Sequence, residues 1–440
     1  MTSTGHCPRP PLAPGLPLLG NALGMAGDVQ AFLVRQYQML GPIFRVRAAH
    51  REFTVMAGAN ANSFLRTRGE SCLSNRGTMG GLDDEFGMRV HALSGRPHRH
   101  LRTILGRGLS RDLLAARWDS FTALTEQRID EWLEADTLVV VDQFQRLAAD
   151  QLSLVLAGTA STAQFELLRS TFELVLDVAV AGKWPRAMLH LPTYRRNRAK
   201  ILAFAHTALR ERAIRPHGGP PDLLDHALAA TDENGRPYPP DVRAGIALQG
   251  YFAGINTVAY LYSLLLYVLL RHPHILERVT AEVDTAFAGD GLSFDTLREM
   301  TAVHGLILET LRIYPPAPAS VRTARQSFEF EGFRVDEGNR VLVATTVPHH
   351  LAEYYPHPEI FDIDRDFTAS RSKGVYAPFS VGTHACLGAS MTDALAAATT
   401  ALMVRHLRLR LPTPDYQLRL RSTPGPNPGK RFRVTVLGRR

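Results

Sequence analysis

The run of residues 245–270 contains no charged residue, and this constrains the fold more than any other feature of the chain. It is long enough to span a bilayer. However, Gln249, Asn256 and Thr257 place polar side chains within it, and it lies mid-chain between charged, amphipathic segments. The centre of a large protein also requires a helix that is apolar on all sides. We therefore expect a buried central helix rather than a membrane span.

The pattern around this run predicts a mainly helical chain. A segment rich in Gly and Pro, 234–240, precedes the run, so we expect one helix over 241–270, about 45 Å long. Helical periodicity dominates over about 97–313 and 386–405, whereas 41–60, 326–346 and 406–437 favour strands. The sequence thus predicts a mainly α fold with a smaller β lobe, of the α+β class, in a single domain over 1–440.

Local patterns add detail at both ends of the chain. Five prolines among the first 20 residues predict an extended strap rather than a helix. Residues 43–46 and 52–56 are typical of two strands around a turn, and 328–335 and 340–346 of two further strands. We expect a last helix over 386–407.

Charge and cysteine content limit the classes of function. The chain has 50 basic and 42 acidic residues, and its scattered basic residues do not form the aromatic-interleaved patch of a nucleic-acid binder. They form either a solvated surface or a face that docks an acidic partner. Three cysteines, Cys7, Cys72 and Cys386, are too few for a disulfide framework. No signal peptide precedes them, so we expect a cytoplasmic protein.

Cys386 lies in a distinctive stretch that begins at Phe379 and contains Gly382, His384 and Gly388. We expect this cysteine to open a helix, where the dipole favours a thiolate. A lone cysteine is more often a small core residue. The stretch, however, resembles the haem-ligand loop of the cytochrome P450 family and matches every fixed position except an Arg, here His384. The resemblance implies that Cys386 ligates the iron of haem b. His384 then makes a weaker, pH-sensitive propionate contact or is a tolerated replacement.

A second signature is the pair Glu309 and Arg312, at i and i+3 on a helix that stops at Pro315. This spacing puts both side chains on one face, and a buried pair would need a third partner for the remaining Arg donors. Glu-x-x-Arg alone is very common. In the family the partner is a downstream Arg, which Arg365 matches loosely, so the resemblance implies a structural network that braces the Cys386 loop.

The third signature lies within the long helix, at Ala253, Gly254, Asn256 and Thr257. In the family the small pair lets the helix open over the haem, an acid follows, and the Thr hydroxyl contacts dioxygen. Here Asn256 replaces the acid. An amide can hold a water but cannot release a proton, so proton delivery must use another route or run slowly. Outside this family the same run would be an ordinary helix bend.

Haem propionates require cationic donors. His98 and Arg102, at i and i+4, match the family's donors on an early helix, and Arg322 matches a third. Each of them alone would be read as a surface cation.

The resemblance covers nearly the whole chain and implies a monooxygenase that inserts oxygen from O2 into a small apolar natural product or lipid. Electrons would come from NAD(P)H through a reductase and a separate ferredoxin or flavodoxin, docked near Arg107, Arg111 and Lys373. We expect a monomer without a membrane anchor. The resemblance places the apolar pocket near Ala253, Gly254 and Thr257, the segment 318–321, the loop before His98 and the turn near Pro424.

Two alternatives to this monooxygenase stay open. The first is a thiolate-haem enzyme that uses peroxide or performs desaturation, coupling or cyclisation. The second is a non-catalytic haem-fold partner. The sequence leaves open which substrate is bound and which of its carbons reacts.

Overall fold

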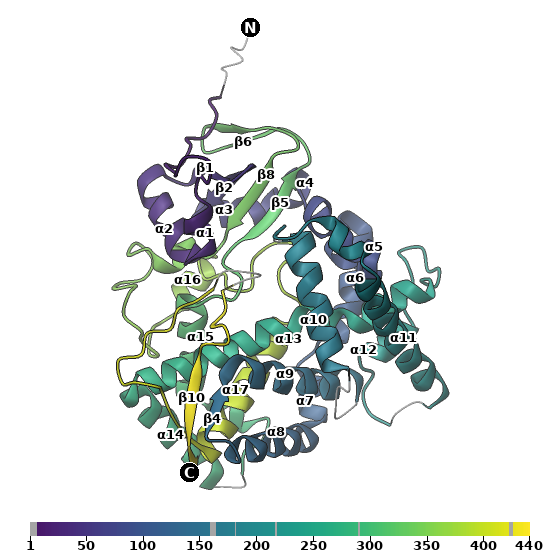
Figure 1. The fold of residues 1–440 in the computed structure, drawn as a ribbon, viewed down its shortest axis with the longest axis vertical. Coiled ribbons are helices and arrows are strands. Elements are labelled where there is room, and N and C mark those ends of the chain that lie inside the picture. Colours follow the sequence, from purple (N-terminus) through teal and green to yellow (C-terminus); the bar gives the residue numbers. More distant parts are fainter. Residues whose placement is uncertain (1–6, 159–163, 181, 216–217, 289–290, 422–425) are drawn as a thin grey trace.

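The charge-free run lies in helix α13 (Pro240–Arg271), which crosses the middle of the molecule (Figure 1). Among the described residues it is the one helix long and apolar enough to span a membrane, but 72% of its most apolar 18-residue window is buried. It packs against α9 (Val140–Ala157), α11 (Pro192–Ile214) and α17 (Ala389–His406). The prediction of a buried central helix is confirmed, and both its ends lie within one residue of those expected.

The structure is a computed structural model and describes residues 7–158, 164–180, 182–215, 218–288, 291–421 and 426–440. The other described α-helices are α1 (Ala22–Ala26), α2 (Val29–Leu40), α3 (Ala59–Thr67), α4 (Gly69–Cys72), α5 (Arg76–Phe86), α6 (Gly95–Arg107), α7 (Asp112–Ala116), α8 (Trp118–Leu133), α10 (Phe165–Val175), α12 (Leu223–Leu228), α14 (Pro273–Ala288), α15 (Thr301–Ile313) and α16 (Thr368–Ser372). Short 3₁₀ segments are Arg89–His91, Arg186–His190, Thr296–Glu299 and Val347–His350, and Leu176–Val180 is a π-helical turn. Helices α1 to α5 precede the predicted helical body, so helix begins earlier in the chain than expected.

The strands form three small sheets. The largest has the order β1-β2-β8-β5-β3, from β1 (Ile43–Ala48), β2 (Arg51–Ala57), β8 (Arg340–Ala344), β5 (Ser320–Ala324) and β3 (Leu73–Ser74). The second has the order β4-β10-β9, from β4 (Thr137–Val139), β10 (Arg433–Arg439) and β9 (Leu407–Arg410). The third pairs β6 (Phe328–Phe330) with β7 (Phe333–Val335). The fold is therefore mainly α with a smaller β part, as predicted.

The first described residues run as an extended strap along the largest sheet. The Ala13 N–H donates to the Arg45 carbonyl, and the Arg45 N–H donates to the Pro11 carbonyl. The expectation of an extended proline-rich start is confirmed from residue 7 onward.

The single strand expected over 328–335 is wrong, because the chain reverses in its middle. Glu331 and Gly332 both have positive φ, 50° and 76°. Two successive residues of this kind make the tight turn that suits the twist of a hairpin. The segment is therefore the β6–β7 hairpin.

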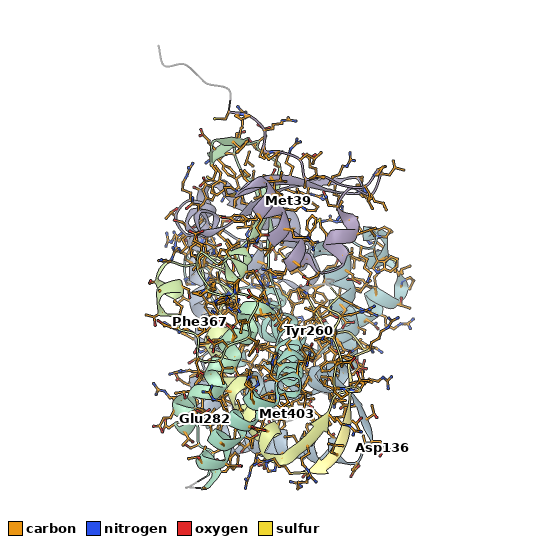
Figure 2. All side chains as sticks on the ribbon, turned by 90° about the vertical axis from the view of Figure 1, so that its left-hand side faces the viewer. Met39, Asp136, Tyr260, Glu282, Phe367 and Met403 are labelled. Atoms are coloured by element: carbon orange, nitrogen blue, oxygen red, sulfur yellow. The ribbon has the colours of Figure 1, made fainter. Side chains whose placement is uncertain are left out.

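The β parts lie at opposite ends of the helical body (Figure 1), with β1, β2, β5 and β8 near the N-terminus and β4 and β10 near the C-terminus. Figure 2, turned by 90°, shows Met39 of α2 toward the first end, Asp136 toward the second, and Tyr260 of α13 between them. The largest apolar cluster surrounds α13, and two smaller ones pack on the larger sheet.

Candidate active site

The loop before α17 carries the Cys386 motif. A 2.9 Å backbone hydrogen bond from the Cys386 N–H to the Phe379 carbonyl closes it. Gly382 turns the loop with φ of +80°, and a Cβ there would lie 2.6 Å from the Leu65 carbonyl oxygen, so a side chain does not fit. Helix α17 begins only at Ala389, and the predicted start at residue 386 is wrong. Turns and bends precede the helix over residues 383–388. The spacing of apolar residues in the sequence does not distinguish such turns from the first turn of a helix.

The Cys386 thiol lines a cavity. Its exposed surface faces this cavity, because protein atoms surround the thiol on its other sides. Burial raises its pKa, and the Gly388 N–H and the Arg102 guanidinium offset the rise only in part. The Gly388 N–H, directly before α17, thus favours the thiolate as expected, but burial outweighs its effect on the pKa. A bound metal ion deprotonates a coordinating thiol, so a ligand role needs no low pKa in the free protein.

The cavity beside Cys386 is formed by α13, the Cys386 loop and several other parts of the chain. Its volume is about 1600 Å³, including the part open to solvent. The enclosed part that a ligand can fill is about 350 Å³, within the roughly 300–1,000 Å³ of ordinary ligand pockets. The described residues that line it are Asn75, Met79, Val90, His91, His98, Arg102, Leu109, Leu152, Gln249, Gly250, Ala253, Gly254, Thr257, Val258, Leu261, Leu311, Pro316, Ala317, Ala319, Ser320, Arg322, Thr345, Pro378, Phe379, Ser380, His384, Ala385, Cys386, Leu387, Gly388, Met391, Thr392 and Leu395. The lining thus combines Cys386, two guanidinium groups and an apolar wall in one space.

The lining agrees in part with the pocket expected from the sequence. Ala253, Gly254 and Thr257 line it, and so do Ala319 and Ser320 from the expected segment 318–321. The expected turn at Pro424 lies outside the described residues. A Cβ at Gly388 would meet nothing closer than 4.0 Å, so the wall of the cavity is open there.

Two guanidinium groups line the cavity without a carboxylate partner. Arg322 is 6% exposed, and its Nη1 donates only to the Val321 carbonyl at 3.3 Å. Burial lowers the pKa of Arg322 to about 10 and also lowers that of Arg102. Across the described ranges, neither Arg forms an ion pair with the protein. Burying an unpaired charge is costly, so the pair fits a ligand that brings two carboxylates of its own, as haem does.

Two neutral histidines complete this polar end of the cavity. The rings of His98 and His384 stack with centroids 4.0 Å apart, and burial lowers their pKa values to about 4 and about 3. His384 Nδ1 is 3.0 Å from Asn75 Nδ2, whereas both ring nitrogens of the fully buried His98 have no hydrogen-bond partner in the described structure. Nothing in the sequence pattern pointed to Asn75, which lies just before α5.

Thr257 and its neighbour Asn256 point to different surroundings. Thr257 lines the cavity, and its Oγ1 donates to the Ala253 carbonyl at 2.7 Å. Asn256 is not among the lining residues; its Oδ1 accepts a 2.7 Å hydrogen bond from Gln145 Nε2 of α9. Gln145 Nε2 also lies 3.3 Å from Glu173 Oε1. No Asp or Glu lines the described part of the cavity.

The Glu309 carboxylate joins two arginines below the Cys386 loop. It accepts from Arg312 Nε and Nη2, both at 2.7 Å, and from Arg365 Nε at 3.2 Å. Glu309 and Arg312 are fully buried. The structure thus brings together the three residues of the expected network.

His349 connects this network to the loop, and sequence reasoning missed it. Its Nε2 accepts from the Ala377 N–H at 2.9 Å, so Nδ1 carries the proton donated to the Arg312 carbonyl at 3.1 Å. Burial lowers the pKa of His349 to about 3. Arg312 Nη1 in turn donates to the His349 carbonyl at 2.8 Å. Ala377 lies two residues before Phe379, so the network reaches the base of the loop.

Comparisons with known proteins agree with this geometry. The family model described as Cytochrome P450 matches residues 10–426. Cyclooctat-9-en-7-ol 5-monooxygenase of Streptomyces melanosporofaciens is 27% identical over 443 residues, covering 94% of this chain and 90% of the relative. Sterol 14alpha-demethylase of Mycolicibacterium vanbaalenii is 24% identical over 408 residues, covering 89% of each protein.

A solved cyanobacterial cytochrome P450 with bound retinoic acid superposes with a TM-score of 0.83, covering 98% of this chain and 100% of that one at 24% identity. At that identity the likeness concerns the fold alone. With the family model over almost the whole length, these findings establish the identity that the cysteine loop suggested: this chain is a member of the cytochrome P450 family.

Proposed function

We propose that this P450 monooxygenase binds haem b through Cys386 and oxidises an isoprenoid substrate, a terpenoid or sterol-like molecule. The observation that carries the proposal is one cavity that joins Cys386, the unpaired cations Arg102 and Arg322, and an apolar wall beside Thr257. When bound, haem supplies a thiolate-ligated iron that activates oxygen.

The polar end of the cavity would hold the cofactor. Arg102 and Arg322 would pair with the propionates, and His98 and His384 would donate neutral hydrogen bonds to them. Gly388 leaves room for a flat ring to approach. Since Cys386 and these cations come from α6, β5 and the Cys386 loop, we propose that one domain over 1–440 builds the site.

The substrate class is supported by the lining and by two relatives. Apart from the cofactor end, the cavity wall is mostly aliphatic, which favours a ligand with little charge. The names of the two relatives refer to the alcohol cyclooctat-9-en-7-ol and to sterols, and sterols are isoprenoids. We extend that class, and not either particular substrate, to this chain.

Asn256 favours a second candidate, a peroxide-using or non-hydroxylating reaction. Gln145 holds the Asn256 amide, and no carboxylate lines the described part of the cavity. The described lining therefore offers no carboxylic acid that could deliver a proton directly. Thr257 is the hydroxyl placed to orient a proton donor such as water. We keep Thr257 as the proposed catalytic residue and Asn256 as part of the route that replaces the acid.

The electron source belongs to the proposal as well. We propose a separate ferredoxin or flavodoxin fed by an NAD(P)H reductase, in the cytoplasm, docking on a monomer near Arg107, Arg111 and Lys373. The net charge of +8 favours an acidic carrier. A non-catalytic haem protein would bind the cofactor and show no turnover with any carrier.

The test compares oxygen with peroxide as the oxidant. Purified protein, a surrogate ferredoxin and reductase, NADPH and isotopically labelled O2 are incubated with a panel of terpenes and sterols. The proposal predicts a product that carries one labelled oxygen atom. Product from hydrogen peroxide alone, with no labelled product under O2, would favour the second candidate. No product under either condition would contradict both.

A further inference from the structure

One polar pair in the cavity takes no part in the cofactor end described above. Gln249 of α13 and His91, in the short helix Arg89–His91, both line the cavity. Gln249 Nε2 and His91 Nε2 are 2.7 Å apart, a short contact between residues 158 positions apart in the chain. Gln249 is 5% exposed.

The pair lies in a mostly apolar part of the wall, close to the cofactor end. The His91 ring lies 6.0 Å from the Phe252 ring, and Val90 and Gly250 also line the cavity next to the pair. Burial lowers the pKa of His91 to about 4, and the nearby Arg322, His98 and Arg102 lower it further. The imidazole is therefore neutral at neutral pH. Two neutral polar side chains in an apolar wall are the kind of group that orients a ligand.

The Gln249 and His91 side chains can still form hydrogen bonds to a ligand while they are bonded to each other. If the Gln249 amide donates to His91 Nε2, then Gln249 Oε1 is a free acceptor and His91 Nδ1–H a free donor. If the amide is turned over, His91 Nε2–H donates to Gln249 Oε1, leaving the amide N–H donors and the Nδ1 acceptor. No other hydrogen bond of either side chain occurs within the described ranges. Both arrangements offer at least one donor and one acceptor, the two roles that a hydroxyl can pair with.

We propose that Gln249 and His91 form an anchor for a hydroxyl group on the isoprenoid substrate. This inference rests on the proposed function, since it names a feature of the substrate of that same site. A neutral pair selects a neutral oxygen, while the cations Arg102 and Arg322 serve the cofactor. A hydrocarbon in the same place would leave these polar atoms without partners, which costs binding free energy.

The anchor also constrains where oxidation takes place. Gln249 precedes Thr257 by eight residues, which is about 12 Å along the helix axis. If the reacting carbon lies near Thr257, then the anchored hydroxyl lies near the other end of the molecule. The account predicts oxidation at a carbon remote from the hydroxyl rather than at its neighbours.

The test uses matched ligand pairs that differ by one hydroxyl: menthol and p-menthane, cedrol and cedrane, phytanol and phytane. Dissociation constants are read from the spectral change that follows when a ligand displaces water from the ferric haem. The wild-type protein should bind at least one alcohol about three- to tenfold more tightly than its hydrocarbon, the worth of one or two neutral hydrogen bonds.

Two variants remove the anchor, Gln249→Leu and His91→Phe, the second keeping a ring beside Phe252. Each should reduce the alcohol preference to about one, and the double variant should do no more than either single one, because the pair acts as a unit. The control Met79→Leu changes an apolar residue of the same wall and should affect both ligands of a pair alike.

Each other outcome has a definite meaning. Equal binding of alcohol and hydrocarbon by the wild type, or an unchanged preference in both variants, overturns the anchor and leaves the proposed function standing. His91→Phe could lose part of its haem while the protein that keeps haem shows an unchanged alcohol preference. That result would place His91 at the cofactor and overturn the anchor too. If no ligand of any pair binds, the isoprenoid class itself is wrong, and the anchor falls with it.

Discussion

Replacing Glu309 by Gln tests how much the charge network below the Cys386 loop contributes to stability. The substitution keeps the shape of the side chain and removes its charge. The carboxylate is fully buried and accepts from two nitrogens of Arg312 at 2.7 Å and from Arg365 Nε at 3.2 Å. It also accepts from the Asp362 N–H at 3.1 Å. After the substitution two guanidinium groups share one neutral oxygen, and the new amide N–H groups face donors.

Breaking a buried ion pair by removing one partner costs about 3–5 kcal/mol. We expect Glu309→Gln to lower the free energy of unfolding by an amount in that range. Because Arg312 holds the carbonyl of His349, whose ring accepts from the Ala377 N–H, the same change should loosen the base of the Cys386 loop. A smaller fraction of the protein should then show the carbon monoxide spectrum of a thiolate-ligated haem.

The assay is urea unfolding followed by far-UV circular dichroism at a fixed haem saturation. The matched control is Glu359→Gln, whose carboxylate is 70% exposed and lies 3.9 Å from His357. An exposed pair of this kind contributes at most about 1 kcal/mol. A loss in Glu309→Gln no larger than that of the control would refute the claim that the network stabilises the loop.

Three further changes test other parts of the account. Burial alone raises the pKa of Asp222, but hydrogen bonds and charge from Arg212 and Arg117 outweigh it and hold that pKa below its usual value. The stabilisation is therefore fully present above the unfolded pKa of about 3.9 and is lost as the pH falls from there through the lower folded pKa, so the stability deficit of Asp222→Asn at pH 7 should shrink in thermal melts recorded below pH 4. Arg322→Leu should speed the transfer of haem to apomyoglobin about tenfold or more, as expected for a lost charged hydrogen bond, and an unchanged rate would argue against a propionate contact. Asn256→Asp should raise product formed per O2 consumed, because it restores an acid beside Thr257; no gain would show that the amide does not limit proton delivery.

The sequence predicted those parts of the protein that depend on local pattern. The Gly- and Pro-rich segment 234–240 and the end of the charge-free run predicted the two ends of α13 to within one residue, because both are patterns in the local sequence. The spacing of Gly382, Cys386 and Gly388 likewise located the loop at the cavity. The positive φ of Gly382 is a local requirement, whereas the close approach of the Leu65 carbonyl comes from a distant segment of the chain.

The parts that escaped prediction depend on packing between distant segments. Asn256 was expected in the place of the family's acid, but its contact with Gln145, 111 residues earlier, depends on the packing of α13 on α9 and could not be predicted. The contact of His91 with Gln249 likewise joins two segments that are far apart in the sequence. In the β6–β7 hairpin, by contrast, the sequence itself contains the turn residue Gly332. The strand-like alternation of 328–335 led instead to the prediction of a single strand.

The measurement that tests the central claim most directly is the carbon monoxide difference spectrum of the reduced protein, recorded for the wild type, Cys386→Ser and Cys7→Ser at equal haem content. Cys7 serves as the control because it lies in the N-terminal strap and does not line the cavity. The account predicts that the band of the thiolate-ligated haem is present in the wild type and in Cys7→Ser and is lost in Cys386→Ser. An unchanged band in Cys386→Ser would contradict the assignment of Cys386 as the iron ligand, and with it the proposed function.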